Sequence, residues 1–336
     1  MRRTATIVAA LLTALVLLAG CGGTSESTAG EGGEGGKLTL VAYSTPREVY
    51  EQLTKDFAAT GEGAGFSFDE SYASSGEQSR AVAGGLPADV VALSLAPDVT
   101  RLVDEGLVAA DWSDDEFGGM VTDSVVVFAV RPGNPKKIRT WDDLTRDGVE
   151  VITPNPFTSG GARWNVMAGY GAQLEQGKSE QEAVAYLRDL FANVTVQDKS
   201  ARESLQTFVG GKGDVLLAYE NEAILAQEKG EELDYVVPDQ TILIENPIAV
   251  VQNGKEELAQ AFVDFVRGED AQRAFGEAGY RPIREEVLQE FDYPTPSSLF
   301  TIADLGGWEA VQKEFFDVEA GVMAGIQREL GQSLGE

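Results

Sequence analysis

The residues at positions 155–165 carry the chemical groups of this sequence that are best suited to holding a small anion. They read Asn-Pro-Phe-Thr-Ser-Gly-Gly-Ala-Arg-Trp-Asn, between a strand-like run at 149–153 and a helix-like run from about 162 to 174. Adjacent glycines at a helix start leave backbone N–H groups unpaired, and the helix dipole adds about half a positive charge there. Ser159 supplies a hydroxyl donor at the predicted N-cap. Together these groups predict an anion-binding turn.

Two other places repeat this combination of a strand end, a turn of small residues and a helix start. They are Ser-Ser-Gly at 74–76 and Ser-Ala-Arg at 200–202. In open α/β sheets, ligands lie beyond the carboxyl ends of the strands, where such turns occur. A single turn of this kind is more often only a helix cap. Three helix starts aimed at one point, however, are able to hold a dianion without any cationic side chain.

Strands and helices alternate along the chain, which predicts an α/β fold with mostly parallel sheets. At 45–48, Thr-Pro-Arg-Glu predicts a helix start with Thr45 as N-cap and Glu48 completing a capping box. The apolar run at 125–130 and the segments 235–238 and 242–244 are candidate crossovers between two lobes. Other predicted strands are 37–43, 65–71, 89–93, 195–197, 214–218 and 249–251, and other predicted helices are 77–83, 97–105, 181–191, 200–209, 256–267 and 271–278.

The first 36 residues predict export and lipid anchoring. Arg2 and Arg3 precede an apolar run at 5–18 that is too short to span a bilayer. Leu-Ala-Gly-Cys at 18–21 resembles a bacterial lipobox, so residues 1–20 are predicted to be a signal peptide and Cys21 the lipid-modified N-terminus. Residues 21–36 then form a flexible, Gly-rich tether. The alternative is an ordinary cleaved signal with an accidental cysteine.

Composition and charge exclude several classes of protein. Histidine is absent and Cys21 is the sole cysteine, which excludes Ser-His-Asp and Cys-His catalysis and metals held by His or Cys. The 55 acidic against 26 basic residues give a net charge of −29, which argues against binding nucleic acid or an anionic membrane. A buried anion site remains compatible with this charge, because exposed charges are screened beyond about 8 Å at physiological salt. We expect no enzyme activity, no cofactor and no metal site.

The segment 155–163 resembles the Asn-Pro-Lys-Ser/Thr-Ser-Gly-x-Ala-Arg motif of the prokaryotic sulfate-binding proteins, the solute receptors of sulfate/thiosulfate ABC importers. Eight of the nine positions fit, and Phe157 stands where the family usually has Lys. Five further segments resemble landmarks of the same family: Gly-Asn-Pro at 133–135, Trp-Asp-Asp-Leu at 141–144, Glu-Asn-Glu-Ala at 220–223, Tyr-Arg-Pro at 280–282 and Leu-Phe-Thr-Ile at 299–302. The resemblance covers almost all of the chain after the tether.

This resemblance implies a periplasmic-binding-protein fold of the second type, in which two α/β lobes are joined by two crossing strands and the ligand lies in the inter-lobe cleft. We place lobe 1 at 37–124 and 244–336, the latter with the C-terminal tail, and lobe 2 at 125–243. It also implies the ligand donors: backbone N–H groups of Ser75, Gly160, Gly161 and Ala201, the hydroxyl of Ser159, and Tyr219, which stands where the family uses the indole of a Trp.

Two departures from the family pattern bear on the site. A phenol donates a hydrogen bond as an indole does, but it also accepts one, so Tyr219 is either a ligand donor or a residue that only packs in the cleft wall. Replacing Lys by Phe157 is expected to alter the helix start or a surface contact. Arg163 and Arg202 are interpreted as supports that pair with carboxylates or carbonyls, and Asp89 as a residue that orients a turn.

The implied function is that of an extracytoplasmic receptor, anchored to the cell membrane through Cys21, that binds sulfate or thiosulfate and delivers it to an ABC importer permease powered by a separate ATPase. A monomer is expected. Because the implied ligand shell consists of donors, we hypothesise that hydrogen phosphate, which carries a proton needing an acceptor, is excluded. The alternatives are the same fold binding molybdate, tungstate, phosphate or a sulfonate, a sulfatase or phosphatase, and a sensory or adhesive lipoprotein.

Overall fold

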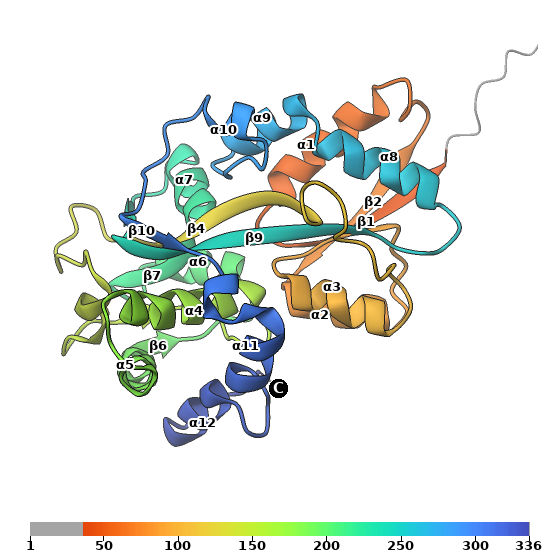
Figure 1. Cartoon of the computed structure of the whole chain (residues 1–336). Helices are drawn as coiled ribbons and strands as arrows, with labels where there is room; N and C mark the ends of the chain where they lie inside the picture. The colour runs from red at the N-terminus through yellow and green to blue at the C-terminus, as the bar shows by residue number, and fades with distance from the viewer. Residues whose placement is uncertain (1–35, 336) are drawn as a thin grey trace, which may run out of the picture. The chain divides into compact units, whose positions relative to one another are not determined.

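Two long strands, β4 (Met120–Val130) and β9 (Gln240–Val250), run antiparallel to each other and connect two groups of strands (Figure 1). The computed structural model describes residues 36–335. The predicted signal peptide, Cys21 and the tether up to residue 35 therefore lie outside the described residues. Within the described part, the strands follow the order β2-β1-β3-β9-β4-β7-β5-β6, with β10 beside β9 and β8 beside β4.

The first group contains β1 (Lys37–Tyr43), β2 (Ser67–Ala73) and β3 (Val90–Ala92), which pair in parallel, and β3 pairs antiparallel with the end of β9. Alternate residues of a strand point to opposite faces. Accordingly, Leu38 and Leu40 join one buried cluster while Val41 joins another. The first cluster involves α1 (Arg47–Ala58), α8 (Glu256–Val266) and α9 (Glu269–Glu277), and the second α2 (Ser75–Ala83) and α3 (Ala96–Asp104).

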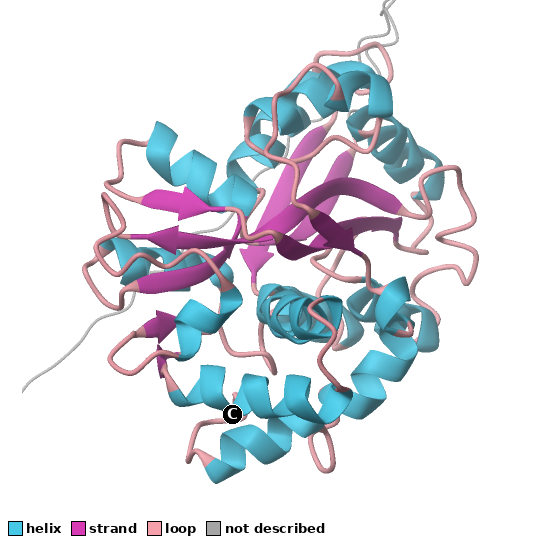
Figure 2. Cartoon of the chain, turned by 60° about the vertical axis from the view of Figure 1, so that its left-hand side comes forward, coloured by secondary structure: helices cyan, strands magenta, loops and turns pink. Residues whose placement is uncertain are grey.

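The second group contains β5 (Val151–Ile152), β6 (Val194–Val196) and β7 (Val215–Tyr219), again parallel, with β7 antiparallel to the second half of β4. Short β8 (Asp234–Val236) also pairs with β4. Helices cover both faces of the strands (Figure 2), which explains why residues 125–130 are apolar without alternation. One face packs on α4 (Gly160–Glu175) and α5 (Glu180–Ala192), the other on α6 (Ala201–Val209) and α7 (Glu220–Glu228).

The C-terminal segment adds α10 (Glu285–Leu288), β10 (Ser298–Phe300), α11 (Gly307–Phe315) and α12 (Val322–Glu329). Trp308 of α11 packs edge-on against Trp164 of α4, with ring centroids 4.7 Å apart, and Phe315 does the same with Tyr170. Helices α11 and α12 thus belong to the core cluster of α4 and α5. The lobe limits 37–124 with 244–336, and 125–243, stay a prediction.

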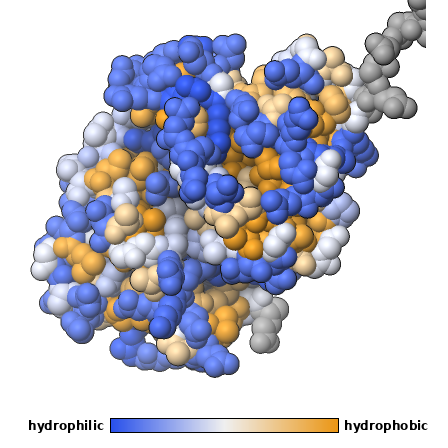
Figure 3. Space-filling view, turned by 45° about the vertical axis from the view of Figure 1, so that its right-hand side comes forward, coloured by the Kyte–Doolittle hydropathy of each residue, from blue (hydrophilic) through white to orange (hydrophobic). Residues whose placement is uncertain are grey.

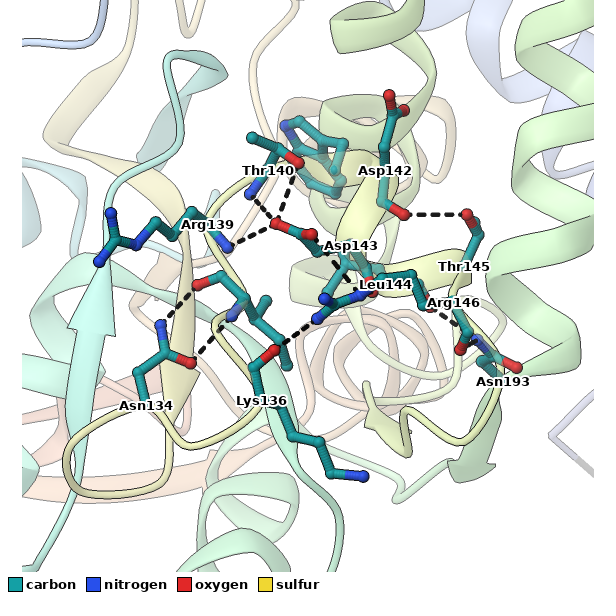
Figure 4. A network of polar contacts seen from close by, with 12 residues as sticks. Asn134, Lys136, Arg139, Thr140, Asp142, Asp143, Leu144, Thr145, Arg146 and Asn193 are labelled. Atoms are coloured by element: carbon teal, nitrogen blue, oxygen red, sulfur yellow. Dashed lines mark hydrogen bonds and ion pairs between the residues drawn. The ribbon is translucent and has the colours of Figure 1, made fainter.

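A network of polar contacts fixes the connection between β4 and β5, which includes the short 3-10 helix Trp141–Thr145 (Figure 4). The Asp143 carboxylate accepts hydrogen bonds from the backbone N–H groups of Arg139 and Thr140 at 2.8 and 2.9 Å. The side chain of Asn134 bonds both the N–H and the C=O of Ile138. Two of the family landmarks, at 133–135 and 141–144, therefore hold a connection in place.

The predicted start of α1 is wrong by one residue, and its predicted cap is absent. The N-cap is Pro46, and no side chain caps the helix. The Thr45 hydroxyl instead accepts a hydrogen bond from Tyr280 at 3.1 Å, and Glu48 bonds Arg202. The Thr45 and Glu48 side chains, predicted to form a capping box, therefore bond residues far away in the sequence instead.

The surface shows few large apolar side chains. Among residues 36–335, the exposed large hydrophobic residues are Leu86, Leu299 and Val318, and hydrophilic residues cover much of the face in Figure 3. None of the helices formed by these residues has both the length and the apolar character needed to cross a bilayer. The excess of acidic residues therefore lies mainly on the surface, outside the core clusters.

Candidate functional site

A small cavity lies where the carboxyl ends of strands from both groups meet the starts of three helices. The volume open in it to the centre of a water-sized molecule is about 10 Å³, far below the roughly 300–1,000 Å³ of sites that hold drug-sized molecules. It suits a ligand of only a few atoms. All six predicted ligand residues, Ser75, Ser159, Gly160, Gly161, Ala201 and Tyr219, line this cavity, together with Tyr43, Ser44, Thr45, Ser74, Ser94 and Ser200.

The three helix starts are those of α2, α4 and α6, whose N-cap residues Ser74, Ser159 and Ser200 all have extended backbone angles. The first N–H groups of a helix have no partner within it. In agreement, no acceptor among residues 36–335 bonds the backbone N–H of Ser75, Gly160, Gly161 or Ala201. Four backbone donors at the cavity are thus unpaired.

The serine hydroxyls at these helix starts have different partners. Ser75 Oγ donates to the Asp98 carboxylate at 2.6 Å and accepts from the Ser94 N–H at 3.0 Å, so this hydroxyl is already paired. Ser200 Oγ accepts from the Glu203 N–H, as an N-cap does. Ser159 makes no such cap bond and lies buried at the cavity wall. Of these three hydroxyls, that of Ser159 has no partner among residues 36–335 and that of Ser200 keeps its own hydrogen, so both are able to donate to a ligand.

The two glycines differ in how closely the opposite wall approaches them. A Cβ placed on Gly160 would lie 2.6 Å from Ser94 Oγ and 2.5 Å from a Leu95 methyl carbon. A Cβ on Gly161 would lie 3.4 Å from the Tyr219 ring, which is ordinary van der Waals contact. Gly160 therefore permits the close approach of α4 to the β3–α3 connection, whereas Gly161 has more room.

Tyr219 ends β7 and is the N-cap residue of α7. Its side chain is buried, and burial raises its pKa well above the usual value, so the phenol is neutral. The phenol oxygen lies 2.7 Å from Ser94 Oγ. Ser94 is not among the residues predicted from the sequence, although it directly follows the predicted strand at 89–93 and therefore lies where ligand groups are expected in an α/β sheet.

Among the described residues, no Lys, Arg, Asp or Glu lines the cavity. Arg163 and Arg202, predicted as supports, have the expected kinds of partner. Arg163 donates to the Pro156 carbonyl at 2.8 Å and to Gln312 at 2.9 Å, and Arg202 bonds Glu48. The cavity is therefore polar but carries no ionised side chain.

The predicted structural role of Asp89 is confirmed by its contacts. Its carboxylate accepts from the Thr39 N–H and from Asn253 Nδ2, both at 2.6 Å, and pairs with Lys255. It is also absent from the residues lining the cavity. Asp89 thus anchors the β1 and β3 starts to the segment after β9.

Phe157 is buried, with 8% of its surface exposed, in the core cluster of α4. The expectation of a surface contact at this position is wrong. Its aromatic side chain belongs to the apolar cluster that also contains residues of α4, α11 and α12, so the departure from Lys concerns packing.

Two buried acids follow Tyr219. Glu220 pairs with Arg281 at 2.8 Å. Burial raises the pKa of Glu222 to about 7, although the nearby Arg202 acts in the opposite direction. Neither lines the cavity, and no group of three or more His, Cys, Asp or Glu that could hold a metal occurs among residues 36–335.

Comparisons with known proteins agree with this fold. Residues 38–281 match the family described as bacterial extracellular solute-binding protein. The chain is 43% identical over 321 residues to the sulfate-binding protein of Synechococcus elongatus, an alignment that covers 92% of each chain. This chain belongs to the sulfate-binding protein family.

More distant and structural relatives extend this assignment. The chain is 33% identical to the thiosulfate-binding protein of Pseudomonas aeruginosa over 85% of this chain and 90% of that one. Its structure matches that of the sulfate-binding protein SubI from Mycobacterium tuberculosis with a TM-score of 0.81 and 44% identity, over 84% of this chain and 99% of that one. The predicted family and the predicted two-lobed α/β fold are thereby confirmed, with sheets that are mixed because the crossing strands pair antiparallel.

Proposed function

We propose that this protein binds sulfate in the cavity between the starts of α2, α4 and α6 and delivers it to the permease of an ABC importer. The observation that carries the proposal is the convergence of four unpaired backbone N–H groups on a small cavity without ionised side chains. The hydroxyl of Ser159 and the phenol of Tyr219 complete the donor set. Relatives named sulfate-binding proteins support the choice of anion.

The chemistry of binding follows from these donors. Sulfate is fully ionised at neutral pH and offers only acceptor oxygens, so each N–H and O–H of the cavity finds a partner. Hydrogen bonds to an ionised group are stronger than neutral ones, and three helix dipoles direct positive potential at the same point. Hydrogen phosphate brings a donor of its own, and a donor that meets another donor costs about 1–3 kcal/mol. The site therefore favours sulfate over phosphate.

Thiosulfate is a second candidate ligand, because a thiosulfate-binding protein is among the relatives. Thiosulfate has the same charge as sulfate and replaces one oxygen with a larger sulfur atom. The small size of the cavity favours sulfate when both anions compete.

We further infer how the receptor is attached and how it works. Removal of residues 1–20 would leave Cys21 as a lipid-modified N-terminus on the extracytoplasmic face of the membrane, with residues 21–36 as a tether. The protein acts as a monomeric binder without catalysis, since it contains no histidine and its sole cysteine is committed to lipid. A separate subunit supplies ATP hydrolysis, in keeping with the lack of a Gly-x4-Gly-Lys-Ser/Thr motif in the sequence.

Calorimetric titration of the purified protein with sulfate, thiosulfate, molybdate and phosphate tests the proposal. We expect one sulfate per chain, with phosphate at least about tenfold weaker, as one donor–donor conflict predicts. Equal affinity for sulfate and phosphate at pH 7, or no sulfate binding, would refute it. Turnover of an aryl sulfate would refute the assignment as a non-enzymatic receptor.

A further inference from the structure

A hydroxyl pair joins the two walls of the cavity. Ser94 follows β3, Tyr219 ends β7, and their side-chain oxygens lie 2.7 Å apart although the residues are 125 positions apart in sequence. Both side chains are 1% exposed, and both line the cavity. Either oxygen could be the donor on distance alone, so the direction of this hydrogen bond has to come from chemistry.

Ser94 is held firmly by its backbone. Its N–H donates to Ser75 Oγ at 3.0 Å, and its carbonyl accepts from Trp164 Nε1 at 2.8 Å and from Asn246 Nδ2 at 3.0 Å. Among residues 36–335, the Ser94 hydroxyl has Tyr219 as its single hydrogen-bond partner. The serine is therefore positioned for this one contact.

The number of hydrogens decides what the pair presents to a ligand. Each hydroxyl carries one hydrogen, and the bond between them uses one of the two. The other must point elsewhere, and an acceptor-only anion in the cavity is the partner within reach. A phenol is a stronger acid than an alcohol and so is the better donor to an anion. When the phenol oxygen itself accepts a hydrogen bond, its O–H becomes a stronger donor still, because linked hydrogen bonds polarise one another.

We propose that Ser94 is a specificity-determining positioning residue: its hydroxyl donates to the phenol oxygen of Tyr219, fills the accepting side of that oxygen and directs the phenol O–H at the bound anion. Tyr219 then acts as a pure donor, as an indole N–H would. This inference rests on the proposed function of the cavity. It also explains how a residue able to accept a hydrogen bond remains compatible with a site that selects sulfate.

The surroundings of the phenol act on its acidity in both directions. Burial and the nearby Tyr43 raise the pKa of Tyr219, and the hydrogen bonds with Ser94 and Asn246 lower it. A donor to the phenol oxygen stabilises negative charge on it and makes its hydrogen easier to share with an anion. Without Ser94, the oxygen would regain a free accepting side, and the proton of hydrogen phosphate would find a partner there.

A double-mutant cycle tests this assignment, with sulfate and phosphate titrated calorimetrically at pH 7 into the wild-type protein, Ser94→Ala, Tyr219→Phe and the double variant. We expect Ser94→Ala to lower the ratio of sulfate to phosphate affinity by about tenfold or more, in line with one donor–donor conflict removed. In the Tyr219→Phe background, the Ser94→Ala change should leave this ratio unaltered, because the phenol oxygen is gone.

Ser79→Ala is the matched control. Ser79 is a fully buried serine of α2 that donates to the Asp98 carbonyl and does not line the cavity. Its loss should lower thermal stability and leave the affinity ratio unchanged. If wild-type protein binds no sulfate, the proposed function fails. If wild-type protein binds sulfate but Ser94→Ala keeps the wild-type ratio, or if the two substitutions act additively on it, the role of Ser94 is overturned and the sulfate site stands.

Discussion

Glu48 of α1 and Arg202 of α6 form a two-pronged ion pair, with Nη1–Oε1 and Nη2–Oε2 distances of 2.7 and 2.9 Å. The same guanidinium donates to the Thr45 carbonyl at 2.8 Å. Thr45, and Ala201 next to Arg202, both line the cavity. Burial alone would raise the pKa of Glu48, but hydrogen bonds from Arg202 and Lys229 lower it to about 2. The pair therefore stays ionised at neutral pH.

Arg202→Gln is expected to weaken sulfate binding without removing a ligand donor. A hydrogen-bonded ion pair of this kind contributes about 1–2 kcal/mol, so we expect a five- to thirtyfold loss, mainly through faster release. Stopped-flow measurement of the release rate checks this. Arg273→Gln is the control, because Arg273 pairs with Glu290 and Glu269 at the surface, away from the cavity. Equal effects of the two substitutions would contradict the role given to Arg202.

Gly160→Ala and Gly161→Ala should differ sharply in their effect on binding. The added methyl at 160 meets Ser94 Oγ at 2.6 Å, so the two walls of the cavity must separate. Loss of the closed cavity predicts sulfate affinity at least about a hundredfold lower, a cost of roughly 3 kcal/mol. At 161 the nearest atom is 3.4 Å away, and we expect a smaller loss. Calorimetry measures the sulfate affinity of both variants. A larger loss for Gly161→Ala than for Gly160→Ala would contradict this geometry.

Phe157→Lys, which restores the residue usual in the family, should destabilise this chain. Phe157 is 8% exposed among the apolar side chains of the α4 cluster. Burying an ammonium group there, or leaving a cavity, costs about 2–4 kcal/mol. Phe157→Leu should cost less than about 1.5 kcal/mol. Urea unfolding measures both values, and a Lys variant as stable as the wild type would show that this position tolerates exposure.

Asp123 and Glu245 face each other on the crossing strands β4 and β9. Burial and the charge of Glu245 together raise the pKa of Asp123 to about 8, although Arg281 acts in the opposite direction. The Asp123 carboxyl thus keeps its proton to a higher pH in the folded state than in the unfolded state, where its pKa is 3.8. Stability is therefore lost as the pH rises from about 4 through 8.

Asp123→Asn should remove this dependence. We expect the variant to exceed the wild type in free energy of unfolding by at least about 1 kcal/mol at pH 8.5, with little difference at pH 4. Thermal and urea unfolding at both pH values provide the comparison. A variant less stable than the wild type at pH 8.5 would show that the carboxylate is stabilising, contrary to this reasoning.

The three helix starts of the site were predictable from local patterns, and the donors on them from the resemblance to the family. A turn of small residues before a helix is visible in the sequence at Ser75, Gly160 and Ala201, and all three reach one cavity. The roles of Ser94 and Thr45 were not predictable, since each depends on a partner far along the chain, Tyr219 and Tyr280 respectively.

The fold was predicted to a similar extent. Strand β1 and helix α6 agree with their predicted ranges within one residue, because hydrophobic periodicity marks them. Strand β9 appeared as separate short pieces, since Glu245 and Asn246 interrupt its apolar run. Helix α7 was missed because its buried face includes the polar residues Glu220, Asn221 and Glu222; the partners of the first two, Arg281 and Ser124, lie in other elements.

Crystallographic location of selenate tests the central claim most directly. Selenate is a tetrahedral dianion like sulfate, and selenium gives an anomalous signal that marks its position. We predict one strong peak within hydrogen-bonding distance of the backbone N–H groups of Ser75, Gly160, Gly161 and Ala201 and of the hydroxyls of Ser159 and Tyr219. An occupied peak elsewhere with this cavity empty, or no peak at saturating selenate, would contradict the account.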